Sequence, residues 1–233
     1  MTTFVLVHGS GQNASCWSRV ASALAARGHA VHAPDLPKRE TLWTIEHHAA
    51  RIAESVVVPD AVVVAHSLCG IFLPSVARLR ACRLLVHLAA VIPEPGKSVR
   101  DQFTAEPAMF APEWIAAGAR WFDPTQRDSL AREFLFHDCE PSALPWSLGS
   151  VDAIQTQGLV VQPAPCTARP DTPSVAIVAT QDRTLTPDWC RRACRRLLHR
   201  EPIEFDSGHC PQNSRPELLA DLLDRLARGE SAT

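Results

Sequence analysis

A serine, an aspartate and a histidine each follow a short apolar run of this chain. Ser67 lies in AVVVAHSLCG (61–70), Asp182 comes shortly after an apolar run that begins near residue 174, and His209 lies in FDSGHC (205–210). A serine hydroxyl becomes a nucleophile for acyl transfer when a histidine takes its proton and a carboxylate orients that histidine. A single histidine or aspartate in a loop is more often structural. The inference of a catalytic site therefore depends on finding these residues in combination.

The residues around Ser67 favour a sharp turn between a strand and a helix. In a nucleophile elbow the serine adopts a strained backbone conformation, and small residues two positions before and after it prevent clashes. The usual pattern is G-x-S-x-G, whereas this chain has Ala65 and Cys69 at those positions, and Gly70 is one residue too late. The need for small residues is nearly met although the letters differ. The alternative is a serine that only caps the following helix.

A glycine-containing turn, HGSGQ (8–12), follows the first apolar run of the chain. Its backbone N–H groups could face the oxyanion of a tetrahedral intermediate. The alternative is an ordinary glycine-rich turn. The order of turn, serine, aspartate and histidine along the chain argues against coincidence.

Short β-branched runs alternate with amphipathic stretches, which predicts an α/β fold. We therefore expect a six-stranded, mostly parallel sheet covered by helices on both faces. In such a sheet the polar residues that follow the strands lie together at one edge. The expected strands are 3–7, 30–34, 61–65, 84–89, 174–179 and 203–205. The expected helices are 16–27, 42–56, 68–79, 187–198 and 216–228.

One long segment interrupts this alternation. We interpret residues 94–170 as an inserted helical cap, and 1–93 together with 171–233 as the core. The cap is rich in aromatic residues, too many for a solvated linker, so it should cover something apolar. The alternative is a helical excursion that only packs on the edge of the sheet. The aromatic residues expected to contact substrate are Trp114, Trp121, Phe134 and Trp146.

Composition and charge restrict the classes of function. The chain has 233 residues, 46% hydrophobic and 21% charged, which is typical of one globular domain. Its 25 acidic and 23 basic residues give a net charge of −2, so no basic field favours nucleic acid or an anionic membrane. Its apolar stretches are shorter than the ~18 residues that a membrane helix needs. We expect a cytoplasmic protein, monomeric or homodimeric, with a small-molecule substrate.

Other residues with reactive side chains have simpler interpretations. The eight cysteines form no CxxC pair, so reduced thiols are expected. The adjacent histidines at 47–48 and the pair Cys190 and Cys194 lack the partners of a metal site, so no metal or other cofactor is expected. Cys69 and Cys210 neighbour the candidate serine and histidine. They are expected to make the site sensitive to thiol reagents.

The chain also resembles a known family. FVLVHGSGQNASCW (4–17) looks like the opening strand and oxyanion loop of the α/β-hydrolase superfamily, and in particular of the small esterases grouped with plant methylesterases and hydroxynitrile lyases. FHDCEP (136–141) and VVQPAP (160–165) resemble cap segments of the bacterial members of that group. The resemblance covers nearly the whole chain.

The resemblance implies roles for individual residues. Carried over by position, Ser67 is the nucleophile, His209 the general base and Asp182 the acid that orients it. The backbone N–H groups of Ser10 and Leu68 would form the oxyanion hole. Ser67 would then attack an ester carbonyl, and water would cleave the resulting acyl-enzyme.

Two other carboxylates compete with Asp182 for the role of the orienting acid. Glu94 follows an earlier strand, where some members of the superfamily place this residue. Asp206 lies only three residues before His209. Asp182 fits the chain order best, and we expect it to be the acid.

We therefore expect a serine-dependent carboxylesterase for a small apolar ester or lactone. Hydroxynitrile lyases of the group carry a threonine after the first histidine and a lysine after the catalytic one, whereas this chain has Gly9 and Cys210. This departure favours hydrolysis over cyanohydrin cleavage. The alternative is a non-hydrolytic enzyme that uses the same residues for C–C cleavage, elimination or cyclisation. A third possibility is a receptor that keeps the pocket without turnover.

Overall fold

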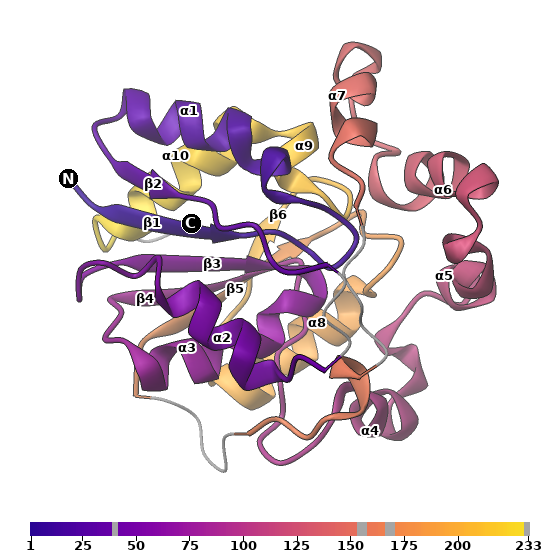
Figure 1. The fold of residues 1–233 in the computed structure, drawn as a ribbon, viewed down its shortest axis with the longest axis horizontal. Coiled ribbons are helices and arrows are strands. Elements are labelled where there is room, and N and C mark those ends of the chain that lie inside the picture. Colours follow the sequence, from indigo (N-terminus) through magenta and orange to yellow (C-terminus); the bar gives the residue numbers. More distant parts are fainter. Residues whose placement is uncertain (39–41, 153–157, 166–170, 231–233) are drawn as a thin grey trace.

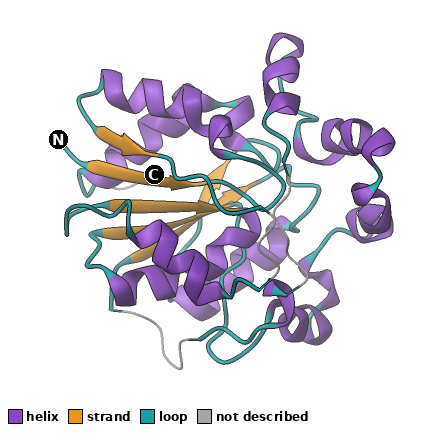
Figure 2. Cartoon of the chain, in the orientation of Figure 1, coloured by secondary structure: helices purple, strands orange, loops and turns teal. Residues whose placement is uncertain are grey.

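The sheet has the predicted architecture. The computed structural model describes residues 1–38, 42–152, 158–165 and 171–230, and in this part of the chain six parallel strands pair in the order β2-β1-β3-β4-β5-β6 (Figures 1 and 2). The strands are β1 (Thr3–Val7), β2 (Ala30–His32), β3 (Val62–His66), β4 (Leu84–Leu88), β5 (Ser174–Ala179) and β6 (Ile203–Phe205). Strands β1, β5 and β6 match the expected ranges to the residue. The predicted fold class is confirmed.

The central strands are apolar on both faces because helices cover the sheet on both sides. Along β1, Phe4 and Leu6 pack into one apolar cluster, whereas Val5 and Val7 pack into the other. Helices α1 (Ser18–Ala26) and α10 (Pro216–Ala227) cover the first face. Helices α2 (Ile45–Ala53), α3 (Leu73–Leu79) and α8 (Pro187–Ala193) cover the second face (Figure 1).

Several predicted helices are α-helical over only part of their length and continue as 3₁₀ or π-helical turns. The predicted helix 68–79 is a 3₁₀ segment followed by α3, and the predicted helix 187–198 is α8 followed by a π-helical turn. The short segments of the core are η1 (Ala14–Trp17), η2 (Ser67–Phe72), η8 (Cys194–Leu198) and α9 (Pro211–Ser214).

The segment between β4 and β5, which we call the cap, lies at the carboxyl edge of the sheet (Figure 1). Its helices are α4 (Val99–Ala105), α5 (Pro112–Ala117), α6 (Pro124–Leu130) and α7 (Leu144–Gly149). Its shorter turns are η3 (Pro107–Met109), η4 (Gly118–Phe122), η5 (Ala131–Leu135), η6 (Pro141–Ala143) and η7 (Leu159–Val161). Residues 153–157 and 166–170 of the expected cap lie outside the described residues.

The cap has an apolar cluster of its own. The ring of Trp114 packs edge-on against those of Trp121 and Phe134, with 5.4 Å between the ring centroids in each pair. Cys210, next to His209, belongs to the same buried cluster. The cap is thus packed onto the segment that carries the candidate histidine.

Two expectations about the whole chain can be compared with the structure. No helix within the described residues is long and apolar enough to cross a membrane. Seven cysteines lie in the described residues, and none of these seven forms a disulfide. The eighth, Cys166, lies outside this part of the chain.

Two buried histidines on the second face of the sheet should make stability depend on pH. His48 is 2% exposed and stacks on Phe72 with 5.0 Å between the rings, and His87 is buried in β4. Burial lowers the pKa of both imidazoles to about 4. Below about pH 6.5 the unfolded chain binds protons at these groups that the folded chain does not bind. Each should therefore remove about 1.4 kcal/mol of unfolding free energy per pH unit as the pH falls from 6.5 toward 4.

Replacing His48 with Phe should remove one of these two contributions. We expect urea unfolding at pH 7 and pH 5 to show a smaller loss of stability for the variant than for the wild type. His32 is exposed, so His32→Phe is the matched control and should leave the pH dependence unchanged. An equal loss of stability in His48→Phe and in wild type would contradict the prediction.

Candidate active site

The turn at the end of β3 holds Ser67 in a strained conformation. The backbone of Ser67 has a φ of 57°, which lies in the left-handed region that residues other than glycine seldom adopt. The strand ends at His66 and η2 begins at Ser67 without an intervening loop. Ala65 and Cys69, the two departures from the usual pattern, are both fully buried. The chain thus forms a strand-to-helix elbow with small side chains in place of glycine.

Two glycines outside the expected positions allow this turn to pack closely. A Cβ on Gly70 would lie 2.2 Å from the carbonyl oxygen of Val91, and a Cβ on Gly9 would lie 2.6 Å from Nδ1 of His66 and 3.1 Å from Cβ of Ser67. No Cβ tolerates such distances from backbone or a buried ring. The requirement for glycine therefore falls at position 70, one residue after the usual place, and in the neighbouring loop.

The three candidate catalytic side chains form a continuous hydrogen-bonded chain. Oγ of Ser67 lies 2.9 Å from Nε2 of His209, and Nδ1 of His209 lies 2.7 Å from Oδ2 of Asp182. The side chains of His209 and Asp182 are 4% and 2% exposed. A neutral imidazole that donates from Nδ1 to Asp182 presents the acceptor Nε2 to the hydroxyl of Ser67. The hydroxyl can therefore lose its proton to His209.

The loop after β5 fixes the second oxygen of Asp182. Oδ1 accepts hydrogen bonds from the backbone N–H groups of Thr184 (2.7 Å) and Leu185 (3.2 Å) and from the Thr184 hydroxyl (3.0 Å). Oγ1 of Thr184 also lies 2.8 Å from Nδ1 of His209. Thr184 was not among the residues predicted from the sequence. Its signal is local, because an aspartate that accepts bonds from N–H groups two and three residues later is typical of an Asx turn.

His66 supports the histidine loop from inside the protein. Its Nε2 donates to the carbonyl oxygen of His209 at 2.7 Å, and its Nδ1 accepts from the Gln212 amide at 3.3 Å. Burial and the neighbouring His209 hold the pKa of His66 well below its usual value. His66 is thus a neutral donor to the backbone of His209.

Ser10 and Leu68, whose backbone N–H groups are expected to form the oxyanion hole, lie beside the same pocket as Ser67. Both residues line this pocket, and no described residue accepts a hydrogen bond from either N–H. Gln12 holds the loop of Ser10 in place, because its amide donates to Ser150 of the cap at 3.1 Å and to Asn213 at 3.0 Å. No sequence pattern predicts this role for Gln12, because its partners are 138 and 201 residues away.

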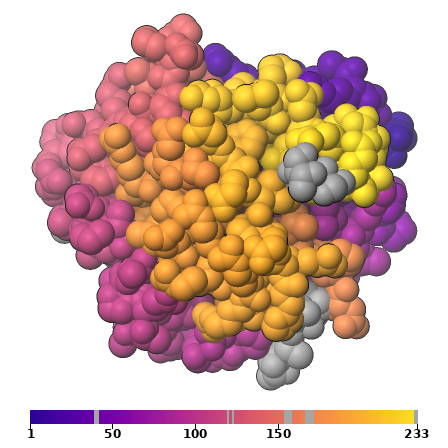
Figure 3. All heavy atoms as spheres, turned by 180° about the vertical axis from the view of Figure 1, so that it is seen from behind, coloured from indigo at the N-terminus to yellow at the C-terminus, as the bar shows by residue number. Residues whose placement is uncertain are grey.

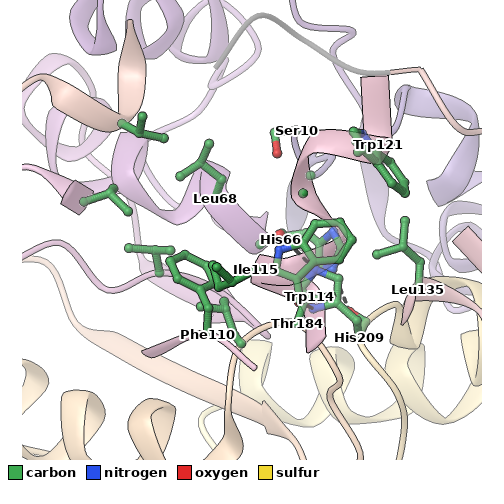
Figure 4. Close-up of a pocket in the computed structure, with 18 of the residues that line it drawn as sticks. Ser10, His66, Leu68, Phe110, Trp114, Ile115, Trp121, Leu135, Thr184 and His209 are labelled. Carbon is green, nitrogen blue, oxygen red and sulfur yellow. Dashed lines mark hydrogen bonds between the residues drawn. The ribbon is translucent and has the colours of Figure 1, made fainter. Parts of the chain in front are cut away.

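The pocket beside these residues has a volume of about 390 Å³ and is mostly apolar. Trp114 and Trp121, both expected to contact substrate, line it together with Phe110, Ile115 and Leu135, which were not among the predicted substrate contacts (Figure 4). Further apolar lining residues are Leu68, Val91, Val99, Phe103, Val160 and Leu185.

The other two aromatic residues expected to contact substrate lie elsewhere. Phe134 is outside the lining and packs behind Trp114. Trp146 is also outside it, and its ring stacks under the guanidinium of Arg19, 4.4 Å from the ring centroid. The structure therefore separates Trp146 from the pocket, because α7 turns this ring toward α1.

Cys69 and Cys210 do not have the environment of reactive thiols. Both are fully buried, and burial raises the pKa of each thiol above its usual value. A buried, protonated thiol is inert toward thiol reagents. The expected sensitivity of the site through these cysteines is therefore not supported.

Comparison with known proteins shows the family and the fold to which the chain is similar. A family model described as alpha/beta hydrolase family matches residues 4–222. A pyrethroid hydrolase of Sphingobium wenxiniae is 24% identical over 254 aligned residues, which cover 97% of this chain and 88% of that protein. The crystal structure of a pyrethroid hydrolase from Sphingobium faniae superposes with a TM-score of 0.78 at 22% identity, covering 97% of each chain. That of polyneuridine aldehyde esterase gives a TM-score of 0.76 at 18% identity, covering 97% of this chain and 99% of that chain.

The two solved structures, at these identities, show a shared fold. The family model adds the sequence relationship, because it spans both the elbow at Ser67 and the loop of His209. The resemblance inferred from the sequence is thereby confirmed, and the chain belongs to the alpha/beta hydrolase family.

Proposed function

We propose that the protein is a serine esterase that hydrolyses small, largely apolar carboxylic esters or lactones. The observation that carries this proposal is the chain of hydrogen bonds from Asp182 through His209 to Ser67, which ends at the wall of an apolar pocket. The matched relatives named hydrolases or esterases support the general reaction class.

In the proposed reaction, Oγ of Ser67 forms a bond to the carbonyl carbon while Nε2 of His209 takes the hydroxyl proton. The N–H groups of Ser10 and Leu68 donate to the oxygen that becomes negative. The bond to the alkoxy group breaks as His209 gives its proton to the leaving alcohol. Water then attacks the acyl-serine, and His209 takes the proton of that water and returns it to Ser67.

The pocket lining favours uncharged substrates. Its walls are mostly aromatic and aliphatic, and the exposed Arg100 is the one Lys, Arg, Asp or Glu among the lining residues that the structure describes. Apolar walls bind an alkyl or aryl group by removing its surface from water, whereas away from Arg100 they give a charged group no partner to replace its hydration. Two of the matched relatives are named pyrethroid hydrolase, and for this chain we propose an uncharged ester without specifying it further.

A fluorophosphonate probe tests the serine mechanism directly. We expect one label per molecule, mapped by peptide analysis to Ser67, together with turnover of an aryl ester in a screen of short-chain and medium-chain esters and lactones. Labelling at a cysteine, or no labelling of a folded protein, would contradict the proposal. Labelling at Ser67 without hydrolysis of any ester would favour the non-hydrolytic alternative.

The size of the apolar pocket predicts a dependence on chain length. Each methylene buried in the pocket is worth about 0.8 kcal/mol, so each added carbon should raise kcat/KM roughly two- to fourfold until the pocket is full. Initial rates on a series of p-nitrophenyl esters would measure this. A flat or falling series from the first added carbon would contradict the expected apolar contact.

A further inference from the structure

Two neighbouring cap residues contact the loops of both the candidate acid and the candidate base. His137 and Asp138 follow the turn η5 and the fully buried Phe136, which anchors this part of the cap in its own apolar cluster. They belong to FHDCEP (136–141) and carry polar side chains that the proposed reaction does not use. Cap residues and the segment that follows the cap lie side by side on the face shown in Figure 3.

Asp138 contacts the residue directly before His209. Its Oδ2 accepts a hydrogen bond from the backbone N–H of Gly208 at 2.7 Å. The approach is close, because a Cβ at position 208 would lie 2.6 Å from Oδ1 of Asp138 and 2.7 Å from Nε2 of His137, so both side chains would have to move to admit it. Arg215, after the histidine loop, donates to the carbonyl oxygen of Asp138 at 3.2 Å. The cap thus contacts the histidine loop at both of its ends.

His137 contacts the residue directly before Asp182. Its Nε2 donates to the carbonyl oxygen of Gln181 at 3.1 Å. Gln181 is also tied to the other loop, since its backbone N–H donates to the carbonyl oxygen of Ser207 at 2.9 Å. His137 and Asp138 therefore lie across the place where the two loops meet.

The oxyanion loop is joined to the cap in a comparable way. Residues Gln12 and Val151 form an antiparallel bridge, and the backbone N–H of Asn13 donates to Ser150 at 2.9 Å. All three loops of the proposed reaction are thus bound to the cap.

The Asp182 loop is also held by an antiparallel bridge between Phe110 and Leu185 and by the Arg183 side chain, which donates to the carbonyl oxygen of Glu133 at 3.1 Å. His137 and Asp138 differ from these contacts because, as neighbours, they bind the residues directly before Asp182 and directly before His209.

We propose that His137 and Asp138 are positioning residues, which hold the loops of Asp182 and His209 in register. This inference rests on the proposed function and adds to it that the cap takes part in aligning the proton-transfer groups. Neither residue lines the pocket, so neither should contact substrate. Their effect should appear in kcat rather than in KM.

Replacing Asp138 with Ala removes the acceptor of the Gly208 N–H and leaves that donor without a partner. A shift of about 1 Å in a catalytic group can lower a rate about 100-fold, so we expect kcat to fall about 10- to 100-fold while KM stays within about twofold. Asp138→Asn keeps an acceptor oxygen and should recover most of the rate. Glu140 is exposed and makes no side-chain contact with the described loops, so Glu140→Ala is the matched control and should leave kcat unchanged.

The measurement should separate alignment from folding. Rates of an aryl ester are divided by the number of sites that a fluorophosphonate labels, so that unfolded molecules do not count. If Asp138→Ala lowers only the labelled fraction or the melting temperature, with normal kcat per labelled site, the residue is merely structural and the proposal fails. Should that variant not fold, His137→Ala carries the same test through its single bond to Gln181, and an unchanged kcat per site would overturn the proposal.

A second readout does not depend on turnover. The proton between Nδ1 of His209 and Asp182 can be followed by NMR as a low-field imidazole resonance. We expect it to be lost or shifted in Asp138→Ala and retained in Asp138→Asn and Glu140→Ala. If the wild type neither labels nor hydrolyses esters, the proposed function fails, while this resonance still tests the alignment. An identical resonance in Asp138→Ala and wild type would overturn the positioning role.

Discussion

Replacing Asp182 with Asn is expected to lower kcat on the order of 10⁴-fold with little change in KM. The same substitution of the catalytic aspartate in a serine protease lowers kcat by about this factor. The geometry explains the size of the effect. Three donors from Thr184 and Leu185 hold Oδ1, so an asparagine would place its carbonyl oxygen there and turn its NH₂ toward His209. That NH₂ would donate to Nδ1 and force the imidazole proton onto Nε2. His209 could then no longer accept the proton of Ser67.

Single-turnover and steady-state rates of the variant would measure this loss, and Glu94→Gln is the control. Glu94 is paired with Lys97 and Arg196 on the surface, and its side chain makes no contact with His209. The control should keep normal kcat. Near-normal activity in Asp182→Asn, combined with a loss in Glu94→Gln, would show that the acid has been assigned to the wrong residue.

The sheet could be predicted from the sequence because its central strands are buried on both faces. The run of β5 is apolar at every position after Ser174, and this signal is independent of what packs against it. The candidate serine and aspartate could be found for the same reason, since each follows such a run, whereas His209 follows the short edge strand β6, in which Glu204 is exposed. Their mutual distances are then consequences of strand order, which brings β3, β5 and the segment after β6 to one edge.

The cap could be predicted only as a segment. Its helices are six or seven residues long and begin at proline or at a capping serine, so no long amphipathic period marks them. Aromatic content indicated an apolar cover but not which rings face the pocket. Trp114 lines the pocket, whereas Phe134 packs behind it, and this difference depends on the direction of each turn.

Supporting polar residues were the hardest to find. Gln12 and Asp138 act through partners that are distant in the sequence, and such contacts leave no local pattern. Thr184 is marked only by the Asx turn that it forms with Asp182. The elbow shows the same limit. The letters suggested a poor match at Cys69, while the close approach that requires glycine occurs at Gly70 against Val91. The motif gives the position at which most chains of this fold need glycine for close packing. In this chain the close contact occurs one residue later, at Gly70.

Replacing Ser67 with Ala should have the largest effect, a fall in kcat on the order of 10⁶-fold. The backbone at position 67 is equally strained with either side chain, so the fold should be retained and the loss should reflect the missing nucleophile. Catalysis that remains would come from the oxyanion N–H groups and the pocket.

The double variant Ser67→Ala with Asp182→Asn distinguishes a triad from three independent residues. If Asp182 acts only by setting the tautomer of His209, and His209 only by taking the proton of Ser67, removing the hydroxyl leaves neither with a proton to move. The double variant should then be no slower than Ser67→Ala alone, because groups that act as a unit are not additive. A further fall by the full factor of Asp182→Asn would mean that Asp182 contributes through another route. Rates measured with enzyme purified free of host esterases, and circular dichroism to confirm folding, would decide between the two outcomes.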